Sequence, residues 1–242
     1  MTFNIVIPAY NTAQWILKTI ASVKSQMYTD WKAVIINDAS TDNTRAKIQE
    51  GIQYDSRFHV IDNSVRVISS LSNFVTGINY LDMADDAVIV MLDGDDWLYD
   101  EYALAHLDKI YTDANIWLTY GQYQPLSGMY ANYCQPLQDT RTYRRDCKWV
   151  TSHLKTYRYK LFKHIRDTDL RDGTGGYYKV CSDIILMFPM IELAGLSRIK
   201  FVDKVLYMYN DLNELNEMKV RGGEQVRISK FIRSLPLYEE LV

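Results

Sequence analysis

The chain has 242 residues, of which 48% are hydrophobic and 24% charged, so it can bury one sizeable core and has the composition of an ordinary globular domain. Its 27 basic and 30 acidic residues give a net charge of -3, which excludes the broad positive surface that nucleic-acid binding requires. Cys134, Cys147 and Cys181 form no Cys-x-x-Cys pair, and no apolar stretch reaches the roughly 20 residues of a transmembrane helix, so we expect a cytoplasmic protein without disulfides, structural zinc or a membrane span.

Strands and helices alternate through the first half of the chain. Short runs rich in isoleucine and valine predict strands over residues 3–8, 31–37, 58–62 and 87–92. Apolar residues at helical spacing predict the helices between them, over residues 15–23, 43–54 and 69–83. This alternation predicts an α/β fold with a doubly wound, mixed but mainly parallel sheet flanked by helices. In such sheets, ligands bind beyond the carboxyl ends of the strands.

The pattern is less regular beyond Tyr120, where polar and aromatic residues are scattered as far as about residue 155. Helices are predicted over residues 160–166, 184–194 and 224–233, and a strand or strand pair over residues 199–209. No linker or repeat interrupts this order, so we interpret residues 1–242 as a single domain.

An acidic turn is the sharpest chemical feature of the sequence. Asp93, Asp95 and Asp96 place three carboxylates in four residues, directly after the apolar run 87–92. Such crowding raises carboxylate pKa values or requires a neutralising charge, which a hard divalent cation with a diphosphate supplies. Gly94 permits a tight turn and the close approach of a ligand. An acidic surface turn would have the same composition, but the position after a central strand favours a metal and diphosphate site.

Two further loops follow predicted strands and should meet the acidic turn at the same edge of the sheet. Tyr10 offers a flat surface on which a nucleotide base can stack, and Asp38 offers a fixed hydrogen-bonding group. We interpret Ser40 and Asp42 as caps of the helix that follows them.

These motifs resemble those of glycosyltransferase family 2. Pro8-Ala9-Tyr10-Asn11, residues 37–44 and Asp93-Gly94-Asp95-Asp96 occur in the order and approximate spacing of that family, whose members have the GT-A fold. The similarity covers about the first 125 residues, and residues 117–123, 152–156 and 188–190 resemble a subgroup of viral and bacterial members. It implies a metal-dependent, inverting enzyme that transfers a sugar from a nucleoside diphosphate, with UDP the expected nucleotide, to a hydroxyl of a glycan or related acceptor.

The resemblance also implies residue roles. Residues 1–122 would bind the nucleotide sugar and metal, and residues 123–242 would form the acceptor side with a C-terminal helix. The implied donor-binding residues are Pro8, Ala9, Tyr10, Asn11, Asp38, Asp93 and Gly94. Asp95 would ligate Mn²⁺ or Mg²⁺ with Asp93 nearby, and Asn210 is either a third ligand or the cap of a turn. Candidate contacts to the acceptor or a phosphate are Asp96, Trp97, Trp149 and His153. The family's Asn-x-Gly element is imperfect here, with Asn63, Asn73 and Gly77 at altered spacing.

An inverting transfer requires a general base that removes the proton of the acceptor hydroxyl. The family's base is a carboxylate at the start of a helix beyond the metal motif, and Asp183 occupies that place. Many relatives have Glu-Asp there, from which Ser182 departs. Asp183 could equally be a helix-terminal residue that the helix dipole favours. Asp169 and Asp172 are alternative bases beside a glycine-rich stretch that resembles a mobile acceptor loop and lacks the Gly-Lys-Ser/Thr of a phosphate loop.

Other functions remain open at this point. A haloacid-dehalogenase-like phosphatase also uses Asp-x-Asp with magnesium, but it expects Thr or Val where Trp97 stands. A catalytically silent module that binds nucleotide sugars or glycans is a second alternative. A nicotinamide oxidoreductase is disfavoured because no Gly-x-Gly-x-x-Gly follows the first strand. A basic set near the end of the chain is either a solvated helix face or a peripheral membrane contact: Lys219, Arg221, Arg227, Lys230 and Arg233.

Overall fold

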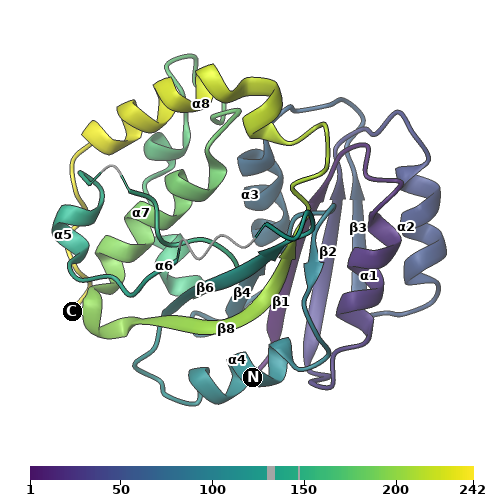
Figure 1. Cartoon of the computed structure of the whole chain (residues 1–242), viewed down its shortest axis with the longest axis horizontal. Coiled ribbons are helices and arrows are strands. Elements are labelled where there is room, and N and C mark those ends of the chain that lie inside the picture. The colour runs from purple at the N-terminus through teal and green to yellow at the C-terminus, as the bar shows by residue number, and fades with distance from the viewer. Residues whose placement is uncertain (130–133, 147) are drawn as a thin grey trace.

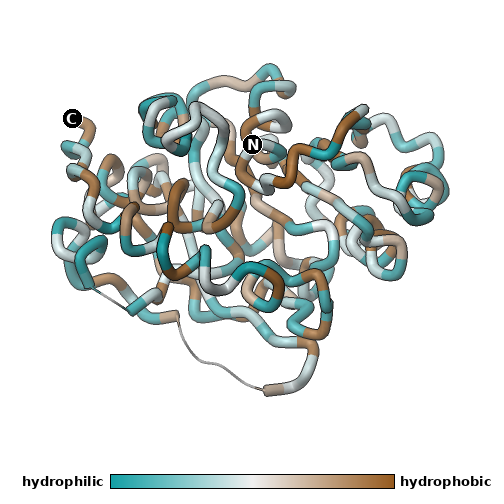
Figure 2. Tube along the Cα trace, turned by 90° about the horizontal axis from the view of Figure 1, so that it is seen from above, coloured by the Kyte–Doolittle hydropathy of each residue, from teal (hydrophilic) through white to brown (hydrophobic). Residues whose placement is uncertain are grey.

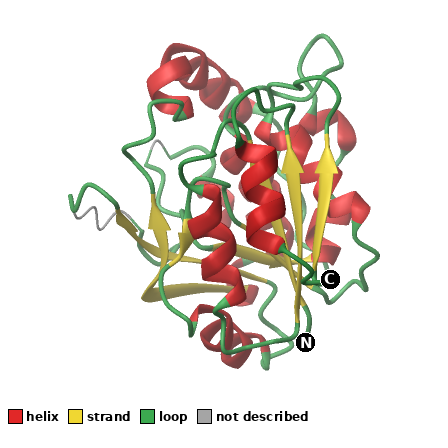
Figure 3. Ribbon diagram, turned by 90° about the vertical axis from the view of Figure 1, so that its right-hand side faces the viewer, coloured by secondary structure: helices red, strands yellow, loops and turns green. Residues whose placement is uncertain are grey.

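A computed structural model describes residues 1–129, 134–146 and 148–242 of the chain (Figure 1). An eight-stranded sheet runs through it, with the strand order β3-β2-β1-β4-β7-β6-β8-β5. Helices pack on both faces of the sheet (Figure 3). The expected mixed, mainly parallel α/β sheet is therefore confirmed.

The first half of the chain is a regular alternation of strands and helices, as the sequence predicts. Its elements are β1 (Phe3–Ala9), α1 (Ile16–Lys24), β2 (Trp31–Asn37), α2 (Thr44–Ile52), β3 (Phe58–Asp62), α3 (Ser70–Tyr80) and β4 (Val88–Met91). All three pairings among β3, β2, β1 and β4 are parallel. Their carboxyl ends therefore lie at one edge, where the loops after β1, β2 and β4 meet.

The second half adds strands beyond the strand or strand pair that the sequence predicts over residues 199–209. Its elements are β5 (Trp97–Leu98), α4 (Ala103–Tyr111), β6 (Leu118–Pro125), α5 (Thr140–Tyr143), β7 (Lys155–Arg158), α6 (Tyr159–Lys163), the 3₁₀ helices η1 (Asp167–Leu170) and η2 (Leu196–Arg198), α7 (Ser182–Ala194), β8 (Ile199–Tyr209) and α8 (Glu217–Ser234). β7 is antiparallel to both β4 and β6, and β6 is parallel to β8. The functional division expected at residue 122 falls inside β6, so it does not separate two structural units.

Alternate residues of the central strands face two apolar layers. Ile5 and Ile7 of β1 face α1, α2 and α4, whereas Val6 faces α3, α6 and α7. Hydrophobic stretches lie in the interior of the molecule and hydrophilic residues along many outer loops (Figure 2). This two-sided burial explains why the strands read as continuous apolar runs.

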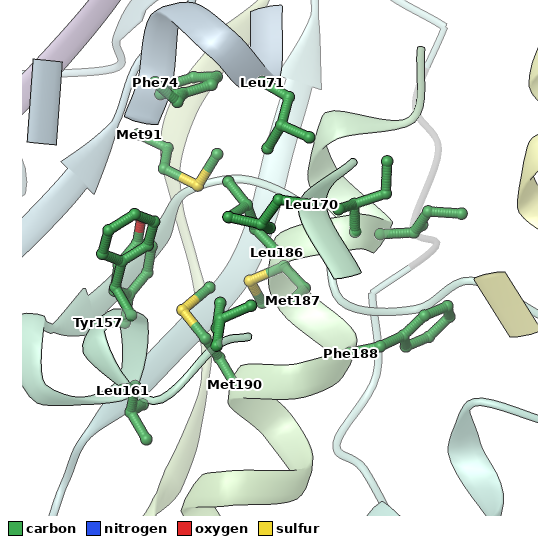
Figure 4. Packing of buried hydrophobic residues seen from close by; sticks show 14 of the residues in the cluster. Leu71, Phe74, Met91, Tyr157, Leu161, Leu170, Leu186, Met187, Phe188 and Met190 are labelled. Carbon is green, nitrogen blue, oxygen red and sulfur yellow. The ribbon is translucent and has the colours of Figure 1, made fainter. Parts of the chain in front are cut away.

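Helix α7 is buried along nearly its whole length. Every residue from Ile184 to Ala194 is buried, including Pro189. Figure 4 shows Leu186, Met187 and Met190 of α7 packed among side chains of α3, β4 and β7. A helix that is apolar on all sides belongs in a core. Its packing fixes the position of Asp183 in its first turn.

Within the described ranges, no helix is both long enough and apolar enough to cross a bilayer. Cys134 and Cys181 are buried free thiols, and Cys147 lies outside the described residues.

Candidate active site

A cavity of about 640 Å³ opens where the loops after β1, β2 and β4 meet the N-termini of α7 and α8. The residues to which the resemblance gives a binding or catalytic role and that line it are Pro8, Ala9, Tyr10, Asn11, Asp38, Asp93, Asp95, Asp96, Trp149, His153 and Asp183. They come from both halves of the chain. Asp169 and Asp172, the alternative bases, are absent from this lining.

Tyr10 and Asp38 form one end of the cavity. The guanidinium of Arg66 lies 3.4 Å from the centroid of the Tyr10 ring, so a cation covers the face of the tyrosine. The buried Asp38 carboxylate accepts hydrogen bonds from the backbone N–H groups of Val67 at 2.8 Å and Ile68 at 3.2 Å. Asp38 Oδ1 also accepts the Asn63 side-chain amide at 2.9 Å. Asp38 therefore holds the loop that carries Arg66, a residue that the motif analysis missed because it lies between motifs.

The loops after β1 and β2 are joined directly. Asn11 Oδ1 accepts a hydrogen bond from Thr41 N–H at 2.8 Å, and Asn11 N–H donates to Ser40 Oγ at 3.0 Å. The interpretation of Ser40 as a helix cap is therefore wrong, because its hydroxyl links the two loops. Asp42 Oδ1 accepts the N–H of Thr44, the first residue of α2, at 2.9 Å, as expected of a capping residue.

Gly94 shapes the acidic turn. Its N–H donates to the Pro8 carbonyl at 2.9 Å, and a Cβ at this position would lie 2.7 Å from that oxygen and 2.9 Å from Ala9 Cβ. Only glycine permits this approach. Gly94 does not line the cavity itself; it brings the turn against the loop after β1.

Asp96 is fully engaged by the protein. Tyr207 Oη donates to Asp96 Oδ2 at 2.6 Å, and the backbone N–H of Asn210 donates to Asp96 Oδ1 at 2.7 Å. Burial, followed by the charges of Asp95 and Asp93, raises the pKa of Asp96 well above its ordinary value. Asp96 thus ties the acidic turn to the end of β8.

Asp93 and Asp95 are the carboxylates that remain for a ligand. Burial raises the pKa of Asp93 to about 6; the nearby Lys155 ammonium opposes this, and the carboxylates of Asp95 and Asp183 add to it. Burial likewise raises the pKa of Asp95, whose Oδ2 accepts the Asn213 amide at 2.6 Å. Two desolvated carboxylates this close require a neutralising charge.

The donor set fits a hard divalent cation that is shared with a substrate. Among the described residues, no three His, Cys, Asp or Glu side chains are grouped so as to hold a metal unaided. Mg²⁺ and similar ions are commonly held by one or two carboxylates together with substrate phosphates and water. Asp95 and Asp93 could hold a cation in this way, with the other ligands coming from water and a phosphate-bearing substrate.

Two residues expected at the site lie elsewhere. Asn210 is completely buried outside the cavity lining, and its Oδ1 accepts the N–H of Leu212 at 3.2 Å, so it caps a turn. Trp97 is buried in β5, where its ring packs beneath Lys18 Nζ at 3.7 Å. Asn213, three residues after Asn210, is the amide beside Asp95. The sequence offers no signal that distinguishes these two asparagines.

Asp183 faces the cavity from the first turn of α7. Its Oδ1 accepts the N–H of Ile184 at 2.9 Å. The residue before the helix, Cys181, has the left-handed φ of 65°, and its N–H donates to Glu217 Oε2 at 2.8 Å. Ser70 Oγ donates to Ser182 Oγ at 3.0 Å. Contacts from α3 and α8 therefore fix the start of α7, and Glu217 is a site residue that the sequence analysis missed.

The pKa of the Glu217 carboxyl group is also raised. Burial raises its pKa to about 7, the Cys181 N–H opposes this, and the charges of Asp183 and Asp93 add to it. The cavity thus contains carboxylates on both the metal side and the α7 side.

Aromatic rings form the remaining wall of the cavity. The His153 ring stacks on Tyr207 with centroids 4.3 Å apart and planes 12° apart, and it also stacks on Tyr209. Burial, followed by the Lys155 charge, lowers the pKa of His153 well below its ordinary value. Trp149 stacks on Tyr143 with centroids 6.2 Å apart, so its ring is also part of the core packing.

Solved structures share this fold. The chain aligns over 99% of its length with 68% of S. aureus TarS 1-349 in complex with UDP-GlcNAc, at 17% identity and a TM-score of 0.71. It also aligns over 98% of its length with 65% of the mannosyltransferase PcManGT from Pyrobaculum calidifontis in complex with GDP-Man and Mn²⁺, at 14% identity and a TM-score of 0.65. The expected GT-A fold is confirmed by these likenesses.

Curated relatives and a family model carry the comparison further. The chain is 31% identical over 123 residues to the Escherichia coli UDP-Glc:alpha-D-GlcNAc-diphosphoundecaprenol beta-1,3-glucosyltransferase WfgD, a match to 50% of this chain and 45% of the relative. It is 26% identical over 207 residues to Pasteurella multocida chondroitin synthase, a match to 84% of this chain and 20% of the relative. The chain thus spans less than half the length of these relatives. The model of glycosyl transferase family 2 matches residues 4–170, and the chain belongs to this family.

Proposed function

We propose that this chain is a metal-dependent glycosyltransferase that binds a nucleoside diphosphate sugar, with UDP as the nucleotide, and transfers the sugar with inversion to an acceptor hydroxyl. One observation carries the proposal: Tyr10, Asp38, Asp93, Asp95 and Asp183 line one cavity although they come from distant parts of the chain. Family membership and the nucleotide sugars named in the complexes of the structural neighbours support it.

The nucleotide base would lie at the Tyr10 end of the cavity. The Arg66 guanidinium stacked on the Tyr10 ring forms with it a flat and cationic surface on which a base can stack. Among the residues that the structure describes, Asp38 Oδ2 accepts one hydrogen bond, that of Ile68 N–H, so it retains an acceptor position for an N–H of the base. Pro8, Ala9 and Asn11 complete this end.

Asp95 and Asp93 would hold Mn²⁺ or Mg²⁺ against the diphosphate. When bound, the cation would act as a Lewis acid that offsets the charge developing on the departing phosphate oxygen. The raised pKa values of both carboxylates indicate that the pair requires such a charge.

Asp183 would act as the general base. As the acceptor oxygen forms a bond to the anomeric carbon, the bond from that carbon to the phosphate oxygen breaks, and the acceptor proton passes to Asp183. Asp183 lines the cavity that also contains Asp93 and Asp95, and Cys181 and Ser182 are tied to neighbouring helices. An anchored helix terminus suits a group that must meet the substrate in one geometry.

A silent binding module is the second candidate, because the same cavity could hold a nucleotide sugar without turning it over. The phosphatase alternative is disfavoured by family membership and by the position of the acidic turn after β4 rather than after β1. A cytoplasmic location and a glycan acceptor stay predictions. A peripheral membrane contact through the basic set also stays a prediction. Two of its members are already engaged within the chain: Arg221 pairs with Glu224, and Arg233 donates to the backbone carbonyls of residues 144 and 146.

The distinguishing experiment incubates the purified chain with a panel of nucleoside diphosphate sugars in the presence of Mn²⁺ or a chelator. Release of free nucleoside diphosphate is then followed with and without simple glycan acceptors. We expect one donor to be turned over in Mn²⁺ alone. Tight binding of a donor without any turnover, across all acceptors and metals, would instead favour the silent module.

A further inference from the structure

Lys155 is a buried cation that the proposed chemistry does not yet use. It is the first residue of β7, its side chain is 3% exposed, and it lines the cavity. Within the part of the chain that the structure describes, its ammonium group forms neither a hydrogen bond nor an ion pair. A buried ammonium group that meets no hydrogen-bond acceptor directly costs roughly several kcal/mol until an acceptor oxygen binds to it. The position therefore calls for an anionic ligand.

The sheet register places Lys155 beside the acidic turn. Met91, the last residue of β4, pairs with Lys155, and Asp93 follows two residues later. The charge of Lys155 opposes the rise in the pKa of Asp93, so the two groups interact through space. An anion bound beside Asp93 and Asp95 would therefore also lie near Lys155.

His153 adds a second unpartnered polar atom to the same wall. Its side chain is 9% exposed, and its buried Nδ1 has no hydrogen-bond partner among the described residues. The ring is held by its stack on Tyr207. Its lowered pKa keeps the imidazole neutral, so Nδ1 or Nε2 can donate one hydrogen bond without adding a charge.

We infer that Lys155, with His153 beside it, forms an oxyanion subsite that binds a non-bridging oxygen of the donor diphosphate on the side opposite Asp95. The inference rests on the proposed function. When the bond between the anomeric carbon and the phosphate oxygen breaks, the electron pair stays on that oxygen, and the fixed ammonium stabilises the added charge without transferring a proton. An oxyanion could also come from the carboxylate of an acidic sugar, and the experiment separates the two sources.

The experiment measures the binding of UDP, uridine, UDP-glucose and UDP-glucuronate in Mn²⁺ by calorimetry, with competition for the weaker ligands. Lys155→Met removes the charge at similar length, and Lys155→Arg keeps a cation. Lys32→Met is the matched control, because Lys32 is an exposed lysine of β2 outside the cavity lining. Lys155→Gln serves as a second neutral variant if the methionine variant lacks a cooperative unfolding transition.

We expect Lys155→Met to weaken the binding of UDP and UDP-glucose by about tenfold or more and to leave the binding of uridine within about twofold. Lys155→Arg and Lys32→Met should not show the same loss of affinity. Equal losses for UDP and uridine, or no loss for UDP, would overturn the inference. A loss confined to UDP-glucuronate would assign Lys155 to a sugar carboxylate and overturn the diphosphate assignment. If the unmodified chain bound neither UDP nor any UDP-sugar, the proposed function itself would fail, which is a different result.

Discussion

Tyr207 Oη lies 2.6 Å from Asp96 Oδ2 and donates a hydrogen bond to it. The same hydroxyl accepts the backbone N–H of Asp93 at 3.3 Å. A residue of β8 therefore fixes the acidic turn after β4, across 111 positions of sequence. Since Asp96 is engaged in this way, Asp93 and Asp95 are the two carboxylates of this turn that remain for a ligand.

Replacement of Tyr207 by phenylalanine should loosen the acidic turn. The buried Asp96 oxygen would lose a donor, so we expect a fall of about 1–3 kcal/mol in the free energy of unfolding, together with weaker donor binding. Tyr111→Phe is the matched control, because it removes a buried hydrogen bond to Thr156 away from the cavity lining. Chemical denaturation and donor titration are the two measurements. Equal effects of both variants on donor affinity would contradict the role given to Tyr207.

Asp183→Asn should separate catalysis from binding. Asparagine keeps the shape of the side chain and an oxygen for Ile184 N–H, but it cannot remove a proton. We expect kcat to fall by about 10²–10⁴-fold with the donor Kd unchanged. Asp172→Asn, in the exposed loop before α7, should leave kcat near its original value. Steady-state kinetics with donor titration check this, and near-normal turnover in the Asp183 variant would remove it as the base.

Glu217 should make the stability of the chain depend on pH. Its pKa of about 7 in the folded protein is above its ordinary value of 4.5. The stabilisation from its protonated form is therefore complete below about pH 4.5 and is lost as the pH rises through 7. The charged groups that act on it are Asp183, Asp93 and Arg221.

The measurement compares the free energy of unfolding of the unmodified chain and of Glu217→Gln across this range. The glutamine keeps an acceptor for Cys181 N–H but does not titrate, so the variant should gain relative stability between about pH 4.5 and 7 and level off above. If the difference in the free energy of unfolding between the two proteins stayed constant with pH, the pKa of Glu217 would not be raised by folding. Glu217→Ala, which removes the acceptor as well, should in addition lower kcat by displacing the start of α7.

Gly94→Ala should distort the site by displacing the backbone of the acidic turn. The added methyl would lie 2.7 Å from the Pro8 carbonyl oxygen, so the acidic turn must move away from the loop after β1. We expect a loss of about 1–3 kcal/mol of stability and of most donor affinity. Gly173→Ala has no atom within 4 Å of its new methyl and should change neither. Unaltered donor binding in the Gly94 variant would refute the close packing of these two loops.

The sequence predicted the first half of the fold well because its strands are buried on both faces. β2, β3 and β8 occupy the predicted residues, since uninterrupted apolar or alternating runs mark them. β7 was missed because it contains Lys155 and Arg158, charged residues that hydropathy assigns to a surface although both are buried here. The start of α8 was placed seven residues late, at Glu224 instead of Glu217, because Gly222-Gly223 interrupts the helical pattern.

In the candidate site, too, some residues have a local signal in the sequence and others have none. Motifs that lie directly after strands gave Tyr10, Asp38, Asp93 and Asp95, because the topology alone brings strand ends together. Residues that reach the cavity through tertiary packing gave no local signal: Arg66, Lys155, Asn213 and Glu217. The choice between Asn210 and Asn213 depends on the conformation of a single turn.

Metal-dependent donor binding through Asp95 is tested most directly by a calorimetric titration of UDP and UDP-sugars into the unmodified chain and Asp95→Asn, each in Mn²⁺ and in chelator. We expect UDP to bind the unmodified chain much more tightly in Mn²⁺ than in chelator, and we expect Asp95→Asn to abolish this difference while it retains the weak metal-free binding. Equal affinity of both proteins for UDP in Mn²⁺, or no binding of any UDP compound to the unmodified chain, would contradict this expectation.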